Sequence, residues 1–171
     1  MRILGAILAG GKAQRFGSDK AQALYRGERL IDRVAQALQA QCGALVVCGR
    51  DEPGFTCIPD LPETGMGPLG GLNAALHYGQ ENDFDFVLAA PCDIPDLPHD
   101  VVEKLFGNGA ALVASQPVVG LWPTALAANL DRFMQGGKLA VMAFADAVGA
   151  RRIELGAPLG NINRPEDMPG N

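Results

Sequence analysis

The sequence has no long apolar run and few basic residues. Its first hydrophobic stretch, Ile3 to Leu8, is too short to cross a bilayer and runs straight into glycines. We therefore expect no signal peptide, no membrane association and a cytoplasmic protein. Lysine and arginine number 14 against 19 acidic residues, for a net charge of −5. Because nucleic-acid backbones require a basic face, we also expect no general nucleic-acid binding, although a small anionic substrate remains compatible.

Paired metal-ligand spacings are missing too. The two histidines, His77 and His99, have no apparent partner and are interpreted as surface or packing residues. Structural zinc usually needs closely spaced ligand pairs, which favours reduced thiols in a cytosolic protein. The cysteines, none of them in a C-x-x-C pair, are Cys42, Cys48, Cys57 and Cys92.

Short apolar runs alternate with segments of helical period, which is typical of a sheet covered by helices on both faces. We predict an α/β fold, a three-layer αβα sandwich around a Rossmann-like, mostly parallel sheet. No repeat or linker interrupts the chain, so a single domain over residues 1–171 is expected. Predicted strands are 3–8, 44–48, 55–58, 86–90, 110–115 and 152–155, with 117–122 extended. Predicted helices are 30–41, 69–78, 100–106, 125–134 and 139–148, before a closing turn at 160–171.

A glycine-rich loop, LAGGKAQRFGSDK, leaves the end of the first predicted strand. Ligands of parallel sheets bind at this edge, and glycines let backbone N–H groups approach a phosphate chain. Lys12, Arg15 and Lys20 add positive charge that offsets a triphosphate. The loop matches neither the Walker A nor the dinucleotide-binding pattern. We predict a nucleoside triphosphate site formed by Leu8, Ala9, Gly10, Gly11, Lys12 and Lys20.

Asp93 follows the predicted strand 86–90 and faces the same crevice as the first loop. Magnesium prefers oxygen ligands and commonly takes one or two carboxylates plus substrate phosphates. The alternative is an aspartate that caps a turn before Pro95. A second glycine-rich segment, Gly65 to Gly71, precedes a helix whose N-terminus suits an anion or a base edge. Close helix–sheet packing explains those glycines equally well.

These motifs resemble those of the molybdenum cofactor guanylyltransferases (MobA-type), within a wider group of nucleotidyltransferases. The first loop is similar to the family's L-A-G-G-x-x-x-R-x-G-x-D-K. Gly67 to Leu72 resembles G-P-L-A-G, and Pro91 to Pro95 resembles P-C-D-x-P. Asn161 to Asp167 resembles the closing N-x-N-T-P-E-[DE]. The four motifs keep the family's order over nearly the whole chain.

The resemblance implies transfer of GMP from GTP to Mo-molybdopterin, with Mg²⁺ as cofactor and release of pyrophosphate. It implies that Asp93 is the metal ligand and acts in catalysis with Arg15 and Lys20. Asp60 would lie near the nucleotide, the alternative being a turn aspartate. Asn161 and Asn163 would bind the acceptor on the pterin side, although asparagine is also common in turns. Molybdenum-cofactor delivery proteins are possible partners, because the acceptor is labile.

The chain departs from the family pattern at three places. The asparagine that the family carries after the second strand falls at Val47 or Cys48, so that contact is missing or made by the backbone or Arg50. Arg164 replaces a threonine. The segment from Ser115 to Pro123 is short and offers few polar groups for an acceptor.

Alternative functions follow from these departures. Related cytidylyl enzymes usually carry A-A-G where this chain has Ala9-Gly10-Gly11, and often lack the aspartate before Lys20, so guanine is favoured over CTP-dependent molybdopterin cytidylyl transfer. Sugar-1-phosphate nucleotidyltransferases are usually longer. A non-catalytic nucleotide-binding module is the alternative of another class. Trp122 either borders the acceptor cleft or, as we expect, packs in the core.

Overall fold

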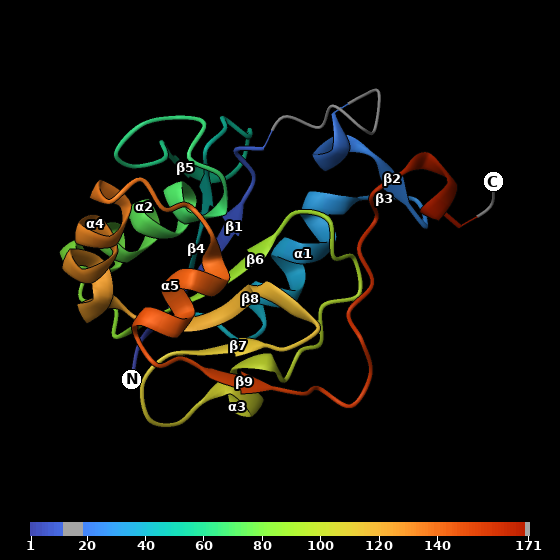
Figure 1. Cartoon of the computed structure of the whole chain (residues 1–171). Coiled ribbons are helices and arrows are strands. Elements are labelled where there is room, and N and C mark those ends of the chain that lie inside the picture. The colour runs from blue at the N-terminus through green and yellow to red at the C-terminus, as the bar shows by residue number, and fades with distance from the viewer. Residues whose placement is uncertain (12–18, 170–171) are drawn as a thin grey trace.

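The computed structural model describes residues 1–11 and 19–169 of the chain. Within these residues a seven-stranded sheet has the order β5-β4-β1-β6-β8-β7-β9 (Figure 1). β8 runs antiparallel to β6 and β7, whereas the other neighbouring strands are parallel. The strands are β1 (Ile3–Leu8), β4 (Ala44–Cys48), β5 (Thr56–Ile58), β6 (Phe86–Pro91), β7 (Ala111–Val113), β8 (Gln116–Pro123) and β9 (Arg151–Ile153).

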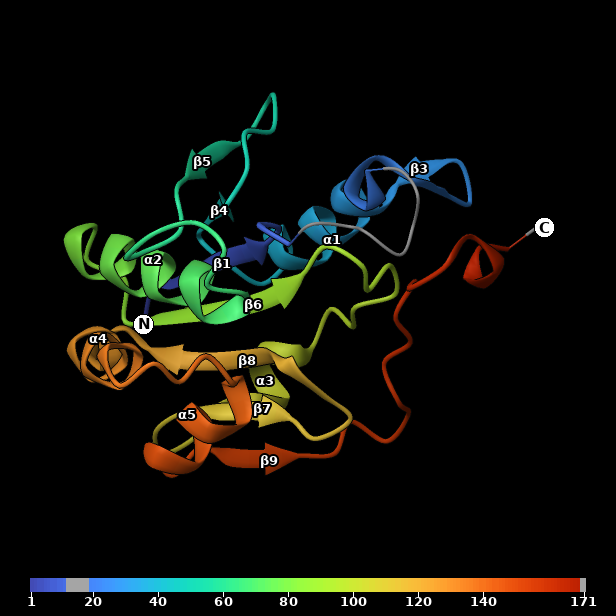
Figure 2. The same cartoon turned by 45° about the horizontal axis from the view of Figure 1, so that its top comes forward.

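Helices cover both faces of this sheet (Figure 2). One face packs against α1 (Leu30–Gln39) and α3 (Val101–Leu105). The other packs against α2 (Pro68–Glu81), α4 (Ala127–Gln135), which the short 3₁₀ turn η2 (Thr124–Leu126) precedes, and α5 (Val141–Ala147). The three-layer αβα sandwich with a mostly parallel sheet is thus confirmed. Since one sheet takes strands from both ends of the chain, we infer a single domain.

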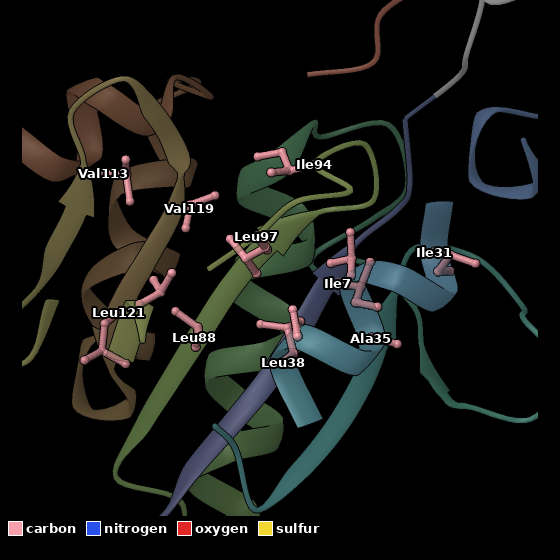
Figure 3. Close-up of a cluster of buried hydrophobic side chains, with 14 of the residues drawn as sticks. Ile7, Ile31, Ala35, Leu38, Leu88, Ile94, Leu97, Val113, Val119 and Leu121 are labelled. Carbon is pink, nitrogen blue, oxygen red and sulfur yellow. The ribbon is translucent and has the colours of Figure 1, made fainter. Parts of the chain in front are cut away.

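The hydrophobic pattern of β1 explains how the sheet is held between its layers. Ile3 and Ile7 belong to the cluster on the α1 face, and Leu4 and Ala6 to the cluster on the α2 face. Alternate residues of a strand point to opposite faces, so both sides of β1 are buried. Figure 3 shows Ile7 among the apolar side chains of α1 and of the segment after β6. This packing fixes the strand from which the glycine-rich loop leaves.

The carboxyl ends of three parallel strands lie in register. Leu8 at the end of β1 pairs with Cys48 of β4 on one side and Pro91 of β6 on the other. The segments that follow these residues therefore start at one edge of the sheet. Sequence reasoning placed the glycine-rich loop and Asp93 at this edge.

Two features near this edge were not predicted. A hairpin joins β2 (Leu24–Tyr25) to β3 (Glu28–Arg29), and a 3₁₀ turn, η1 (Lys20–Gln22), precedes it. Arg26 and Gly27, between the two strands, have φ angles of 51° and 84°. Positive φ at both central residues suits a two-residue hairpin, but Arg-Gly is a weaker signal for it than Asn-Gly.

The end of the chain returns to this hairpin. Figure 1 shows the segment after β9, residues 154–169, running back past the sheet edge toward β2 and β3. We call this segment the C-terminal strap. Ile162 in the strap is buried and packs with Tyr25 and Leu30. The short turn η3 (Pro165–Asp167) follows it.

Two further expectations concern single side chains. Trp122 is 1% exposed and stacks on Phe144, which confirms core packing. His77 is a partly buried packing residue, as expected, and its Nε2 lies 3.0 Å from Oδ2 of Asp131, a partner that the sequence did not reveal. That contact joins α2 to α4, two helices whose pairing sequence spacing does not reveal. Among the described helices, none combines the length and apolarity that a bilayer crossing requires.

Candidate active site

The edge formed by the ends of β1, β4 and β6 contains a cavity of about 190 Å³. It brings together five of the residues predicted for nucleotide binding or catalysis, which are Leu8, Ala9, Gly11, Lys20 and Asp93. Its other lining residues are Asp19, Ala21, Arg50, Pro91 and Cys92. Lys12 and Arg15 lie outside the described residues.

Lys20 and Asp93 form an ion pair in this cavity. Lys20 Nζ donates to Asp93 Oδ2 over 2.7 Å, and the two side chains are 18% and 14% exposed. Lys20 begins η1, whose N-cap is Asp19, and Asp19 accepts a hydrogen bond from the Ala21 N–H. The pair therefore joins a turn near the N-terminus to the second residue after β6.

The remaining oxygen of Asp93 bears on the expected magnesium ion. Oδ1 is buried and has no hydrogen-bond partner in the described part of the chain. Among the same residues no group of three or more histidine, cysteine or acidic side chains converges. A site with one carboxylate oxygen available fits magnesium, which takes its other ligands from substrate phosphates and water. It does not fit a metal held by a full set of protein ligands.

A second cavity, of about 120 Å³, adjoins the same loop and is lined by Leu8, Gly10, Gly11, Asp60, Gly67, Pro68 and Gly71. Asp60 is 5% exposed, and its Oδ1 has no hydrogen-bond partner among residues 1–11 and 19–169. Burial raises the pKa of this carboxyl group above its usual value. An acceptor held in this way, beside a cavity, is suited to a ligand that donates hydrogen bonds.

Glycine is required where the first loop approaches Asp60. A Cβ atom on Gly10 would lie 2.5 Å from Asp60 Oδ2, and one on Gly49 would lie 2.5 Å from the Gly10 Cα. Gly49 also has a φ of 83°, which side chains rarely adopt. The loop after β1 and the turn after β4 can therefore pack against Asp60 only without side chains.

Two glycines of the second glycine-rich segment have different surroundings, one of them close packing and the other a cavity. A Cβ on Gly71 would lie 3.0 Å from Leu8 Cδ2, so this residue allows α2 to pack closely on the sheet. Gly67 is the N-cap of α2, has a φ of 64° and borders the second cavity, with no atom within 4 Å of a Cβ built there. Close packing accounts for glycine at position 71. At position 67, the positive φ angle beside the cavity accounts for it.

The C-terminal strap brings the predicted acceptor residues to the same place. Asn163 Oδ1 accepts a hydrogen bond from Lys20 Nζ over 3.2 Å, and the Ile162 N–H donates to the Asp93 carbonyl over 2.9 Å. Asn161 accepts from Gln116 Nε2 of β8. Lys20 thus contacts both the predicted metal ligand and a predicted acceptor residue.

The departures from the family pattern have structural consequences. Val47 and Cys48 are fully buried, so neither side chain can replace the asparagine, whereas Arg50 reaches the larger cavity. The backbone N–H of Arg164 donates to Asp167 Oδ2, and this contact does not depend on the side chain at position 164. Most of the segment from Ser115 to Pro123 is strand β8, which a tight turn at Ala114 and Ser115 joins to β7.

Sequence reasoning missed three residues near the cavity and considered a fourth, Arg50, only as an alternative. Asp19 and Gln116 were not assigned roles at the site, and neither was Glu52, which is buried and lies within 3.4 Å of Arg50. Arg50 was considered only as a replacement for the asparagine. Its position just after β4 was the available signal, since the ends of parallel strands gather ligand-binding residues.

The chain is similar to known proteins over most of its length. Residues 5–149 match the family model described as the MobA-like NTP transferase domain. A molybdenum cofactor guanylyltransferase of Cereibacter sphaeroides is 36% identical over 98% of this chain and 94% of the relative. One from Acidiphilium cryptum is 32% identical over 95% and 90%.

Solved structures share the fold. The crystal structure of molybdopterin-guanine dinucleotide biosynthesis protein A from Archaeoglobus fulgidus covers 96% of this chain and 94% of its own, with a TM-score of 0.75 and 22% identity. A cytidylyltransferase from Thermus thermophilus that acts on 2-C-methyl-D-erythritol 4-phosphate has a TM-score of 0.73 at 16% identity. The family match spans most of the sequence, and the chain belongs to the MobA-like NTP transferase family.

Proposed function

We propose that this protein is a molybdenum cofactor guanylyltransferase, which transfers GMP from GTP to Mo-molybdopterin and releases pyrophosphate. The observation that carries the proposal is the position of Lys20, whose ammonium group contacts Asp93 and Asn163 at one sheet edge. A group assigned to the triphosphate is thereby next to a group assigned to the acceptor. The names of the relatives support the same reaction.

The second cavity supports guanine as the base. Guanine presents neighbouring N–H donors on its pairing edge, and a carboxylate is an acceptor with two oxygens. Asp60 offers such an acceptor beside a cavity formed largely by glycines. On its pairing edge cytosine presents a ring-nitrogen acceptor where guanine presents a ring N–H donor. A carboxylate, which only accepts, therefore matches cytosine less well. We therefore favour GTP over the CTP alternative.

In the proposed reaction, an oxygen of the acceptor's terminal phosphate bonds to the α-phosphorus of GTP. The bond from that phosphorus to the bridging oxygen breaks, and pyrophosphate leaves with the electron pair. An ionised phosphate is already a nucleophile, so no covalent enzyme intermediate is needed. The protein contributes orientation and charge, from Lys20 within the described residues and from Lys12 and Arg15 in the adjoining loop.

Asp93 would hold the magnesium ion through its free carboxylate oxygen, with Lys20 on the other. The bound ion would supply charge that offsets the phosphate oxygens at the reacting centre. Asn161 and Asn163 would orient the pterin through their amide groups. We also predict that the protein is cytoplasmic and that its product passes to molybdenum-cofactor delivery proteins.

The test is release of pyrophosphate from labelled nucleotide with magnesium and Mo-molybdopterin. We expect release with GTP, dependent on the acceptor, together with a product that contains GMP and pterin. Turnover of CTP in place of GTP would indicate the cytidylyl reaction, and turnover with a sugar 1-phosphate would indicate a sugar nucleotidyltransferase. Nucleotide binding without pyrophosphate release under any of these conditions would indicate a binding module.

Asp60→Asn is expected to weaken base selection and to stabilise the fold at neutral pH. The amide adds donors where guanine requires acceptors, so kcat/KM should fall about 10-fold or more for GTP. Burial raises the folded-state pKa of Asp60 above its unfolded value, so the wild-type protein loses stability as pH rises through the folded pKa. The variant's gain in melting temperature should hold at pH 7 and vanish below about pH 3.9.

Asp51→Asn is the matched control, because Asp51 is exposed in the β4–β5 segment and lines neither cavity. It should change neither base preference nor melting temperature. If Asp60→Asn keeps its preference for GTP over CTP, Asp60 does not read the base.

A further inference from the structure

Glu52 is a buried carboxylate with basic and amide partners. Its side chain is 1% exposed. Its Oε2 accepts a hydrogen bond from Gln22 Nε2 over 2.8 Å, and its Oε1 accepts one from Arg29 Nη1 over 2.6 Å. Arg50 Nη2 lies 3.4 Å from Oε2. A buried charge is tolerated when it is paired and hydrogen-bonded in this way.

Two connections run from Glu52 to the turn that carries Lys20. The first is direct, because Gln22 is the last residue of η1. The second passes through Arg50, whose Nη1 and Nη2 donate to Asp19 over 2.7 and 2.5 Å. Asp19 caps η1 at its N-terminus. Glu52 therefore holds both ends of the turn.

The turn needs such support because it is short. η1 contains three residues, and a single 3₁₀ turn has little stability of its own. Its N–H groups bond to Asp19 and Lys20, with Ala21 N–H to Asp19 Oδ1 at 3.2 Å and Ala23 N–H to the Lys20 carbonyl at 3.2 Å. Loss of the Asp19 and Gln22 anchors would free the backbone of Lys20.

We propose that Glu52 is a positioning residue for nucleotidyl transfer, which acts by holding the η1 turn and Arg50 at the cavity shared by Lys20 and Asp93. This inference rests on the function proposed above. Glu52 does not line either cavity and acts through its partners. Arg50 and Lys20 both line the larger cavity. Glu52 holds the Arg50 guanidinium directly, and it holds the Lys20 ammonium group through the η1 turn.

The experiment compares Glu52→Gln with Glu52→Asp and Asp32→Asn. Glutamine removes the charge and faces three donor side chains with donors of its own, whereas aspartate keeps the charge. Asp32 is the matched control, because it also accepts hydrogen bonds from Arg29, over 2.7 and 2.8 Å, but does not bond to η1 or Arg50. Two readouts are taken, hydrogen exchange at the amides of residues 21–23 and the kinetics of pyrophosphate release from GTP.

In Glu52→Gln we expect faster exchange at residues 21–23, with α2 amides unchanged. We also expect kcat/KM for GTP to fall about 10- to 100-fold, mostly through kcat, because displacement of Lys20 harms the transition state more than ground-state binding. Glu52→Asp should recover part of both losses. Asp32→Asn should keep kcat/KM within about twofold of wild type.

Equal losses of activity in Glu52→Gln and Asp32→Asn, or unchanged exchange at residues 21–23, would overturn the proposal. If Glu52→Gln does not fold, Asp19→Ala removes the link from Arg50 to the turn at an exposed residue. Normal exchange and kinetics in that variant would overturn the proposal as well. Wild-type protein without pyrophosphate release would refute the proposed function, and the exchange measurement would still decide whether Glu52 holds the turn.

Discussion

Replacement of Asp93 by asparagine is expected to lower kcat for GMP transfer by about 1,000-fold while the protein stays folded. Asparagine keeps the size of the side chain but lacks the second oxygen and the charge that would hold magnesium. It also removes the charge that pairs with Lys20 at 2.7 Å. Stopped assays of pyrophosphate release across a magnesium titration measure the loss, which added magnesium should not fully reverse.

Asp96→Asn provides the control for this result. Asp96 lies three residues further along the same segment, is exposed, and accepts a hydrogen bond from the Tyr25 hydroxyl over 2.9 Å. It lies outside both cavities of the candidate site. Asp96→Asn should therefore retain nearly all activity. Near-normal turnover in Asp93→Asn would remove Asp93 from the catalytic site.

Replacement of Lys20 by methionine is expected to lower kcat/KM for GTP by about 100-fold or more. Methionine keeps much of the apolar stem but removes the ammonium group that contacts Asp93 and Asn163. Because Lys20 touches groups assigned to both substrates, KM should rise for GTP and for the acceptor together. Initial rates over a grid of both substrate concentrations measure the two effects.

Lys104→Met is the corresponding control. Lys104 lies on α3 and pairs with Asp100 over 2.8 Å, with both side chains substantially exposed. An exposed pair of this kind contributes little to stability, so activity and melting temperature should be nearly unchanged. A rise in KM for GTP alone in Lys20→Met would show that Lys20 does not serve the acceptor.

The parts of the site that sequence predicted depend on local pattern and strand order. The sequence shows a buried strand followed by glycines, and an aspartate shortly after another buried strand. If the two strands are parallel, the glycine-rich loop and the aspartate lie at the same edge of the sheet. The register of Leu8 with Pro91 realises that expectation, and Lys20 meets Asp93 as a result. Asp60 was predicted near the nucleotide from family resemblance, and the structure adds its contact with glycines.

The parts that sequence did not predict depend on contacts between distant segments. Glu52 looks like an ordinary loop residue, because its burial arises from Arg29 and Gln22, more than 20 positions away. His77 meets Asp131 through the packing of α2 on α4. The Arg26-Gly27 hairpin carries a weak turn signal. No periodicity in the sequence encodes these pairings, so they emerge only with the three-dimensional arrangement.

The path of the C-terminal strap has a consequence for biosynthesis. Lys20 and Asn163 are separated by 143 positions, yet their side chains are in contact, and Ile162 packs beside the hairpin that follows Lys20. A nascent chain on the ribosome can form β1 and its helices early, because those contacts need only the first part of the message. The lysine that we assign to both substrates acquires its second neighbour only after Asn163 has been synthesised, which delays competence for transfer until the strap has left the ribosome.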